Sequence, residues 1–140
     1  MSVSSLLLPV FVQVGLTFFV LLRMAALRQK AFRSGVNPRD IAMREDNWPK
    51  PALQAANCYL NEFELPVLFY ALVAFILITS TNSLIFVLLA WIFVLTRIVR
   101  AYVHLGSNVV QMRGLSFGLG ALVLIVMWVI FALRILVTGA

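Results

Sequence analysis

Charged residues are scarce in this sequence. They make up 11% of its 140 residues, whereas 63% of the residues are hydrophobic. A soluble domain of this size cannot bury so large an apolar fraction in one core. The protein surface must therefore contact lipid rather than water. A chain of this length with several membrane spans has no room for a second, soluble domain, so we expect one membrane domain over residues 1–140.

Cysteine, histidine and acidic residues are rare as well, with one, one and five copies. The single cysteine, Cys58, excludes an internal disulfide and a cysteine-based metal cluster, and we expect no metal site. The apolar neighbours of Cys58 favour a role as a small packing residue, and a catalytic role for its thiol is the less favoured alternative. The net charge of +6 would suggest nucleic acid in a soluble protein. Here the basic residues flank apolar runs, where topology and lipid headgroups explain them, and we expect no nucleic-acid partner.

Long apolar runs dominate the rest of the sequence. A helix that crosses the hydrocarbon core of a bilayer needs about 20 predominantly apolar residues, and four stretches qualify. No basic residue precedes the first stretch, so it lacks the charged start of a cleavable signal peptide. The prediction is an all-α bundle of four transmembrane helices, over residues 3–27, 51–79, 84–105 and 114–137.

Basic residues are concentrated between the first two spans, whereas the turn at residues 79–83 carries no charge. Such loops face the cytoplasm in most membrane proteins, which places both termini on the opposite side. Arg113 agrees with this orientation, and only Arg134 near the end of the fourth span disagrees. The basic residues of the expected cytoplasmic loop, residues 28–50, are Arg28, Lys30, Arg33, Arg39, Arg44 and Lys50.

Polar residues inside the second and third spans recur with helical spacing, so each set lies on one face of its helix. The short turn between these spans makes them antiparallel neighbours. A register centred between Ser80 and Thr81 puts the two sets at equal depth. The pairs that this register predicts are Glu64 with Arg97, Asn61 with Arg100, and Asn57 with His104.

The predicted pair of Glu64 and Arg97 lies about 24 Å from the outer turn, inside a hydrocarbon core about 30 Å thick. A lone charge near the bilayer centre costs at least about 2.5 kcal/mol, so the pair could simply hold two helices together. Arg100 and Arg113, however, leave two excess positive charges at about this depth. The cluster therefore favours an anionic ligand on the cytoplasmic side.

Glu62 should lie outside this cluster, because it is turned by about 100° from Asn61 around a continuous helix. Arg23 or Arg28 of another helix or subunit is its expected partner. The charge of the cluster stays positive even if Glu62 joins it. His104 considered alone is an ordinary interfacial polar residue, and its protonation state is not set by the sequence.

Two motifs resemble the MAPEG family, the membrane-associated proteins in eicosanoid and glutathione metabolism. Residues 61–70, with the sequence NEFELPVLFY, are similar to the second-helix motif of that family. Residues 97–108, with the sequence RIVRAYVHLGSN, and the following Arg113 look like the end of its third helix and the start of its fourth. The resemblance is to a bacterial-type member and covers nearly the whole chain in span order.

The resemblance implies a homotrimer with a site at each subunit boundary, open to the cytoplasm and in many members occupied by glutathione. Asn61 and Glu64 match residues that hold this tripeptide. Arg97 and Arg113 are the nearest matches to arginines that bind its carboxylates or activate its thiol.

The chain departs from the family pattern at three positions of the same cluster. The family usually has an arginine where this chain has Asn57, and well-studied members have tyrosines where Arg100 and His104 stand. The resulting set of expected ligand-binding residues is Asn57, Asn61, Glu64, Arg97, Arg100, His104 and Arg113.

Three function classes fit these residues. In the first, the protein is a glutathione-dependent transferase or peroxidase that acts on apolar electrophiles or lipid peroxides. A free thiol has a pKa of about 8.5, so a cation must stabilise the thiolate, with Arg113 the first and Arg100 the second catalytic candidate. The alternative is a non-catalytic scaffold that binds a lipid or small anion. A proton-coupled transporter with Glu64 as carrier ranks lowest, because Arg97 would hold that carboxylate ionised.

Overall fold

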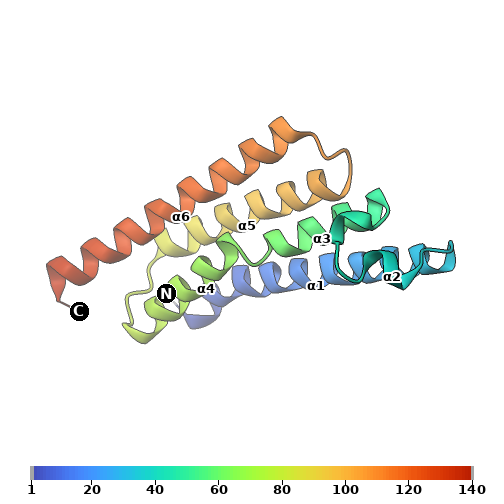
Figure 1. Ribbon diagram of the computed structural model, residues 1–140. Coiled ribbons are helices and arrows are strands. Elements are labelled where there is room, and N and C mark those ends of the chain that lie inside the picture. Colours follow the sequence, from blue (N-terminus) through green and yellow to red (C-terminus); the bar gives the residue numbers. More distant parts are fainter. Residues whose placement is uncertain (1, 140) are drawn as a thin grey trace.

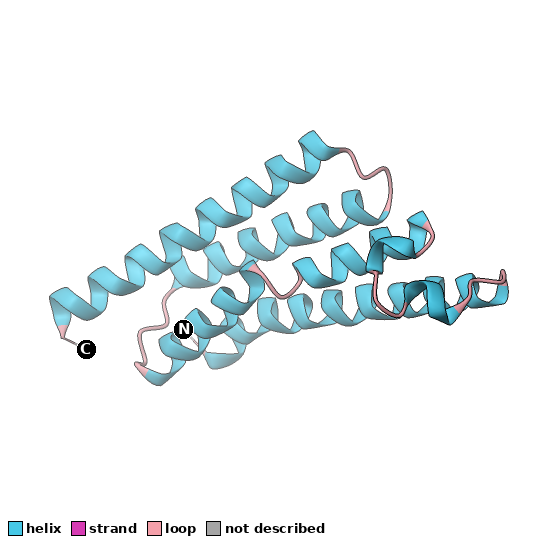
Figure 2. Cartoon of the chain, in the orientation of Figure 1, coloured by secondary structure: helices cyan, strands magenta, loops and turns pink. Residues whose placement is uncertain are grey.

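Four long helical segments form an antiparallel bundle in the computed structural model, which describes residues 2–139 without the side chain of Glu45 (Figure 1). Each segment is long and apolar enough to cross a membrane. Residues 2–139 contain no strand (Figure 2), so the predicted all-α fold is confirmed. The helices of the four spans are α1 (Val3–Arg33), α3 with α4 (Lys50–Asn61 and Leu65–Ile78), α5 (Leu84–Leu105) and α6 (Val110–Thr138).

The first and last helices are longer than the sequence predicted. At about 1.5 Å per residue, α1 is about 46 Å long, more than the hydrocarbon core, so its basic last turn extends beyond that core. The helix ends at Arg33, and Gly35, two residues later, has a φ of 101° that is accessible to glycine without strain. Helix α6 begins at Val110, which places Arg113 in its first turn rather than before it. The loop after α1 contains two short helices, α2 (Pro38–Ile41) and η1 (Glu45–Asn47).

The second span is interrupted, in contrast to the continuous helix predicted over residues 51–79. Helix α3 ends at Asn61, residues 62–64 form turns, and α4 begins at Leu65. Pro66 explains the interruption, because proline has no N–H to donate and its ring clashes with the carbonyl four residues earlier, here that of Glu62. This short non-helical segment determines the geometry of the site described below.

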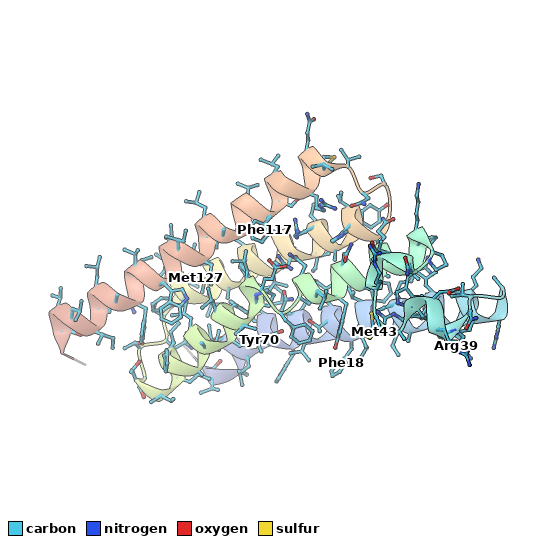
Figure 3. The ribbon with its side chains drawn as sticks, viewed as in Figure 1. Phe18, Arg39, Met43, Tyr70, Phe117 and Met127 are labelled. Atoms are coloured by element: carbon cyan, nitrogen blue, oxygen red, sulfur yellow. The ribbon has the colours of Figure 1, made fainter. Side chains whose placement is uncertain are left out.

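Helix α5 is the centre of the bundle and packs against α1, α3 and α6. The apolar core lies in the half of the bundle that contains both termini (Figure 1), where the rings of Phe69 and Phe93 stack with centroids 4.7 Å apart. Met127 is buried in this core, whereas Phe18 is exposed and projects away from α1 (Figure 3). Many other large apolar side chains are also exposed, as expected of a surface that contacts lipid.

Arg134, which disagreed with the charge pattern, has local partners at the uncharged turn. Its Nη1 donates to the carbonyl oxygen of Thr81 at 3.1 Å, and its guanidinium lies 5.0 Å from the ring centre of Phe86. These contacts join α6 to the connection between α4 and α5. Arg134 therefore has a structural role that is independent of topology.

Gly120 allows the close approach of α5 and α6. A Cβ atom at this position would lie 2.8 Å from Thr96 Oγ1, a hydroxyl that is anchored by donating to the Phe93 carbonyl at 2.6 Å. A β-branched side chain held in this way cannot move aside at low cost. Gly118, on the same helix, has no such neighbour within 4 Å.

We expect Gly120→Ala to lower the free energy of unfolding by about 1–3 kcal/mol, the usual cost of overpacking. The matched control Gly118→Ala should be neutral or stabilising, because alanine favours a helix over glycine by about 1 kcal/mol. Thermal unfolding in detergent, followed by circular dichroism, measures both changes. Equal stability of the two variants would contradict the packing of α5 on α6 described here.

Candidate functional site

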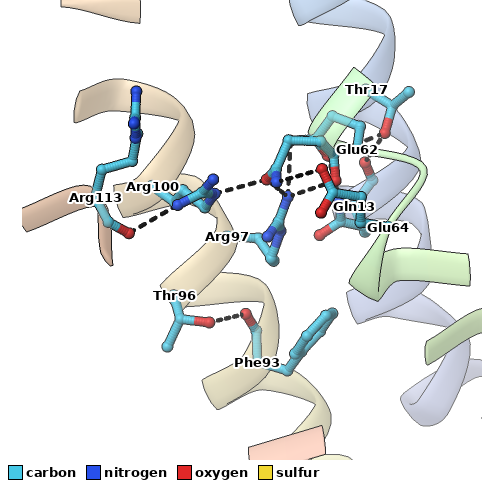
Figure 4. Close-up of polar contacts among 10 residues, drawn as sticks. Gln13, Thr17, Glu62, Glu64, Phe93, Thr96, Arg97, Arg100 and Arg113 are labelled. Carbon is cyan, nitrogen blue, oxygen red and sulfur yellow. Dashed lines mark hydrogen bonds and ion pairs between the residues drawn. The ribbon is translucent and has the colours of Figure 1, made fainter. Parts of the chain in front are cut away.

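A buried ion pair joins the interrupted span to α5 (Figure 4). Arg97 Nη2 lies 3.5 Å from Glu62 Oε1, and both side chains are 1% exposed. The other carboxylate oxygen of Glu62 accepts hydrogen bonds from Gln13 Nε2 at 2.7 Å and Thr17 Oγ1 at 3.3 Å, both on α1. The carboxylate therefore connects three spans of the bundle.

The predicted partner of Arg97 was wrong: the ion pair is formed by Glu62, not by Glu64. Sequence reasoning continued the helical spacing through residues 62–64, whereas the chain leaves the helix there and turns Glu62 inward. Glu64 is exposed and accepts a hydrogen bond from Asn61 Nδ2 at 3.0 Å. The expected partners of Glu62, Arg23 or Arg28, were wrong for the same reason. The argument against Glu64 as a proton carrier that relied on an Arg97 partner no longer holds.

Asn61 connects the buried pair to the surface. Its side-chain oxygen accepts hydrogen bonds from Arg97 Nη2 and from Arg100 Nε, the latter at 2.6 Å. Its backbone carbonyl lies at the end of α3 and accepts two hydrogen bonds, one from the backbone N–H of Glu64 at 3.2 Å and one from Arg97 Nη2 at 3.1 Å. The predicted pairing of Asn61 with Arg100 is therefore confirmed.

Three further arginine contacts connect α5, the loop after it and the start of α6. Arg100 Nη1 donates to the carbonyl oxygen of Arg113 at 2.7 Å, and its guanidinium lies 4.9 Å from the ring centre of Phe117. Arg113 Nη1 donates to Asn108 Oδ1 at 2.7 Å. Neither guanidinium has a carboxylate within ion-pair distance among the described residues.

These groups surround an open pocket of about 300 Å³. It contains six of the seven predicted ligand-binding residues, and the seventh, Arg97, is buried behind Asn61. Asn57 and His104 both line the pocket, but the structure shows no hydrogen bond between them, and His104 Nδ1 is buried without a partner. The lining residues are Asn57, Leu60, Asn61, Glu64, Arg100, His104 and Arg113.

Comparison with known protein families explains this arrangement of motifs. The family model described as MAPEG matches residues 6–133, nearly the whole chain. The chain belongs to the MAPEG family. Neither the curated proteins nor the solved structures contain a match to it.

The pocket of this MAPEG protein has the predicted positive sign but one excess charge instead of the predicted two, because Glu62 neutralises Arg97. Its walls carry the guanidinium groups of Arg100 and Arg113 and the carboxylate of Glu64, which leaves one excess positive charge. The buried pair of Glu62 and Arg97 adds no net charge. Such a pocket attracts an anion, and the described residues contain no cluster of three or more metal-ligating side chains.

Two residues of α1 that were not among the predicted site residues contact the buried ion pair. Gln13 and Thr17 interrupt the first apolar span in the sequence, and the structure shows both donating to Glu62. Because a polar side chain in a span needs a partner, their presence could have indicated a carboxylate opposite them. Cys58, in contrast, is buried between Val20 and Ala101 and does not line the pocket, in keeping with a packing residue.

We expect Glu62→Gln to destabilise this MAPEG protein by about 3–5 kcal/mol, because it leaves the Arg97 guanidinium buried without its counter-charge. The matched control Glu64→Gln removes an exposed carboxylate and should cost much less. Thermal unfolding in detergent of both variants, of Arg97→Gln and of the double variant Glu62→Gln/Arg97→Gln gives the coupling energy.

The double variant should recover much of the loss if the two groups form a pair. Additive losses for Glu62 and Arg97, or a larger loss for Glu64→Gln than for Glu62→Gln, would support the continuous helix and contradict the interrupted span.

Proposed function

We propose that this MAPEG protein binds glutathione in the pocket and uses it as a membrane transferase or peroxidase. The observation that carries the proposal is the charge of the pocket walls, two guanidinium groups and one carboxylate. Glutathione near neutral pH has two carboxylates and one ammonium group. Its charges are thus the complement of those of Arg100, Arg113 and Glu64, and guanidinium groups bind carboxylates with favourable geometry.

The arginines differ in how much of their bonding capacity the protein uses. Arg100 donates to Asn61 and to the Arg113 carbonyl, which orients it firmly at the pocket wall. Arg113 makes one side-chain bond, to Asn108, and lies in the first turn of α6, so it retains donors for a ligand. Arg113 is therefore our first candidate for stabilising a thiolate and Arg100 the second. Bound glutathione would supply a thiol nucleophile for apolar electrophiles or lipid peroxides.

An apolar substrate has a route to this pocket from the bilayer. A groove of about 610 Å³ between α4 and α6 has only apolar walls, among them Leu65, Leu124 and Trp128. Leu65 directly follows Glu64, so the groove begins where the charged pocket ends. A substrate that is dissolved in lipid could therefore approach the ligand without crossing water.

The open side of the pocket suggests that a neighbouring subunit completes it. The family resemblance implies a homotrimer with a site at each subunit boundary, and we propose this assembly here. The alternative function, a scaffold that binds a lipid or small anion without chemistry, uses the same pocket. Binding without turnover would favour that alternative.

Isothermal titration of glutathione into the purified protein should show saturable binding. We expect Arg113→Gln to weaken it at least about tenfold, the effect of losing about 1.4 kcal/mol of interaction. The control Arg39→Gln removes an exposed charge outside the pocket and should bind like the unchanged protein.

A separate measurement tests whether Arg113 promotes ionisation of the glutathione thiol. Ultraviolet difference spectra should show thiolate when glutathione binds the unchanged protein, and less thiolate with Arg113→Gln at saturating glutathione. Absence of binding would overturn the proposed function, whereas binding with an unchanged thiolate signal in the variant would remove Arg113 from the catalytic role.

We also propose that both termini lie on the non-cytoplasmic side, with the pocket near the cytoplasm, because the basic loop dominates the charge asymmetry. A reporter enzyme that is active only outside the cytoplasm should be active when it is fused after Ala140. A cytoplasmic reporter active at the same position would reverse the orientation.

A further inference from the structure

Arg23 is a charged residue within the first apolar span, and the candidate site does not use it. Gln13 and Thr17 donate to Glu62, which is paired with Arg97 on the inside of the bundle. Arg23 is exposed, and no carboxylate of the described residues lies within ion-pair distance of it. A cation at this position in a membrane span requires another explanation.

Arg23 lines a groove of about 320 Å³ between α1 and α5. Leu16, Phe19 and Arg23 recur at helical spacing on α1, and Ile98, Tyr102 and Leu105 do so on α5. This face of α5 is separate from the one that presents Arg100 and His104 to the glutathione pocket. The lining residues are Leu16, Phe19, Arg23, Ile98, Ala101, Tyr102, Leu105 and Gly106.

The polar groups of the groove lie at the depth of the lipid headgroups. Arg23 is about 30 Å along α1 from its first residue, and Tyr102 is about 27 Å along α5 from its first residue. Both distances are close to the thickness of the hydrocarbon core, about 30 Å. The apolar walls therefore extend into the hydrocarbon region, while the guanidinium and the phenol reach the interface.

We propose that this groove binds an anionic phospholipid, with its phosphate on Arg23 and one acyl chain along Leu16, Phe19 and Ile98. A guanidinium binds phosphate through paired hydrogen bonds, and the hydroxyl of Tyr102, which is largely exposed, supplies a second donor. The apolar walls select a lipid over a free phosphate ion. Lys30 and Arg33 in the last turn of α1 add positive charge at this end of the bundle, which favours an anionic over a zwitterionic headgroup.

Native mass spectrometry of the delipidated protein, titrated with phosphatidylglycerol or with phosphatidylcholine of the same acyl chains, tests the headgroup. Arg23→Gln should weaken phosphatidylglycerol binding about fivefold, the effect of about 1 kcal/mol per basic residue near a membrane surface. It should weaken phosphatidylcholine binding less, because the choline cation of that lipid offsets the charge of its phosphate. The control Arg39→Gln, which removes an exposed charge outside the groove, should have no effect.

A second pair of variants tests the acyl chain. Ile98→Trp fills the groove and should weaken the binding of both lipids, whereas Val99→Trp, on the same helix but outside the groove, should not. Inorganic phosphate in excess should fail to displace phosphatidylglycerol. Circular dichroism confirms that each variant retains its helices, and the mass spectra report the number of subunits.

The proposal is overturned if Arg23→Gln and Arg39→Gln weaken binding equally, because binding would then reflect general surface charge. Displacement by inorganic phosphate would indicate an anion site rather than a lipid site. Loss of lipid together with separation of subunits would show that a second copy of the chain covers the groove. Retained phosphatidylglycerol affinity in both Arg23→Gln and Ile98→Trp would also exclude the groove.

Discussion

The buried guanidinium of Arg97 is the constraint on which the rest of the bundle depends. Within the hydrocarbon region no bulk water can replace a missing partner, so the charge must be compensated by the protein itself. Glu62 supplies the counter-charge, and Gln13 and Thr17 bind the second oxygen of that carboxylate. Shifting α1, α5 or the interrupted span relative to the others would break at least one of these contacts.

The interruption at residues 62–64 separates the structural charges from the charges available to a ligand. In a continuous helix, Glu64 would face Arg97 and Glu62 would point away from it, as the sequence predicted. The turn caused by Pro66 directs Glu62 to Arg97 and leaves Glu64 at the pocket. The same turn ends α3, and the carbonyl of Asn61 there accepts a bond from Arg97 as well as one from the backbone N–H of Glu64. One proline thus affects both the stability of the bundle and the composition of the pocket.

The sequence was sufficient for the number of spans and most of the pocket, because these depend on apolar runs and on helical spacing within uninterrupted segments. The family followed separately, from the resemblance of two motifs. Asn61 and Arg100 are paired as predicted, since Asn61 still belongs to α3 and Arg100 to α5. The exchange between Glu62 and Glu64 could not be predicted from spacing, which loses its meaning where the helix stops. Pro66 could have indicated a break, which the prediction of a continuous span overlooked, but not which carboxylate the break would turn inward. The ends of α1 and α6 differ because helices continue past the apolar run into polar sequence.

The side chain of Asn61 transmits the geometry of the buried pair to the pocket. Its oxygen accepts from both Arg97 and Arg100, and guanidinium groups can only donate, so the amide nitrogen must point away from them. That nitrogen donates to Glu64 and orients its carboxylate at the pocket wall. Because a carboxylate accepts several hydrogen bonds, Glu64 keeps capacity for an ammonium group of a ligand. The position of the Glu64 carboxylate in the pocket therefore follows from the arginine buried behind it.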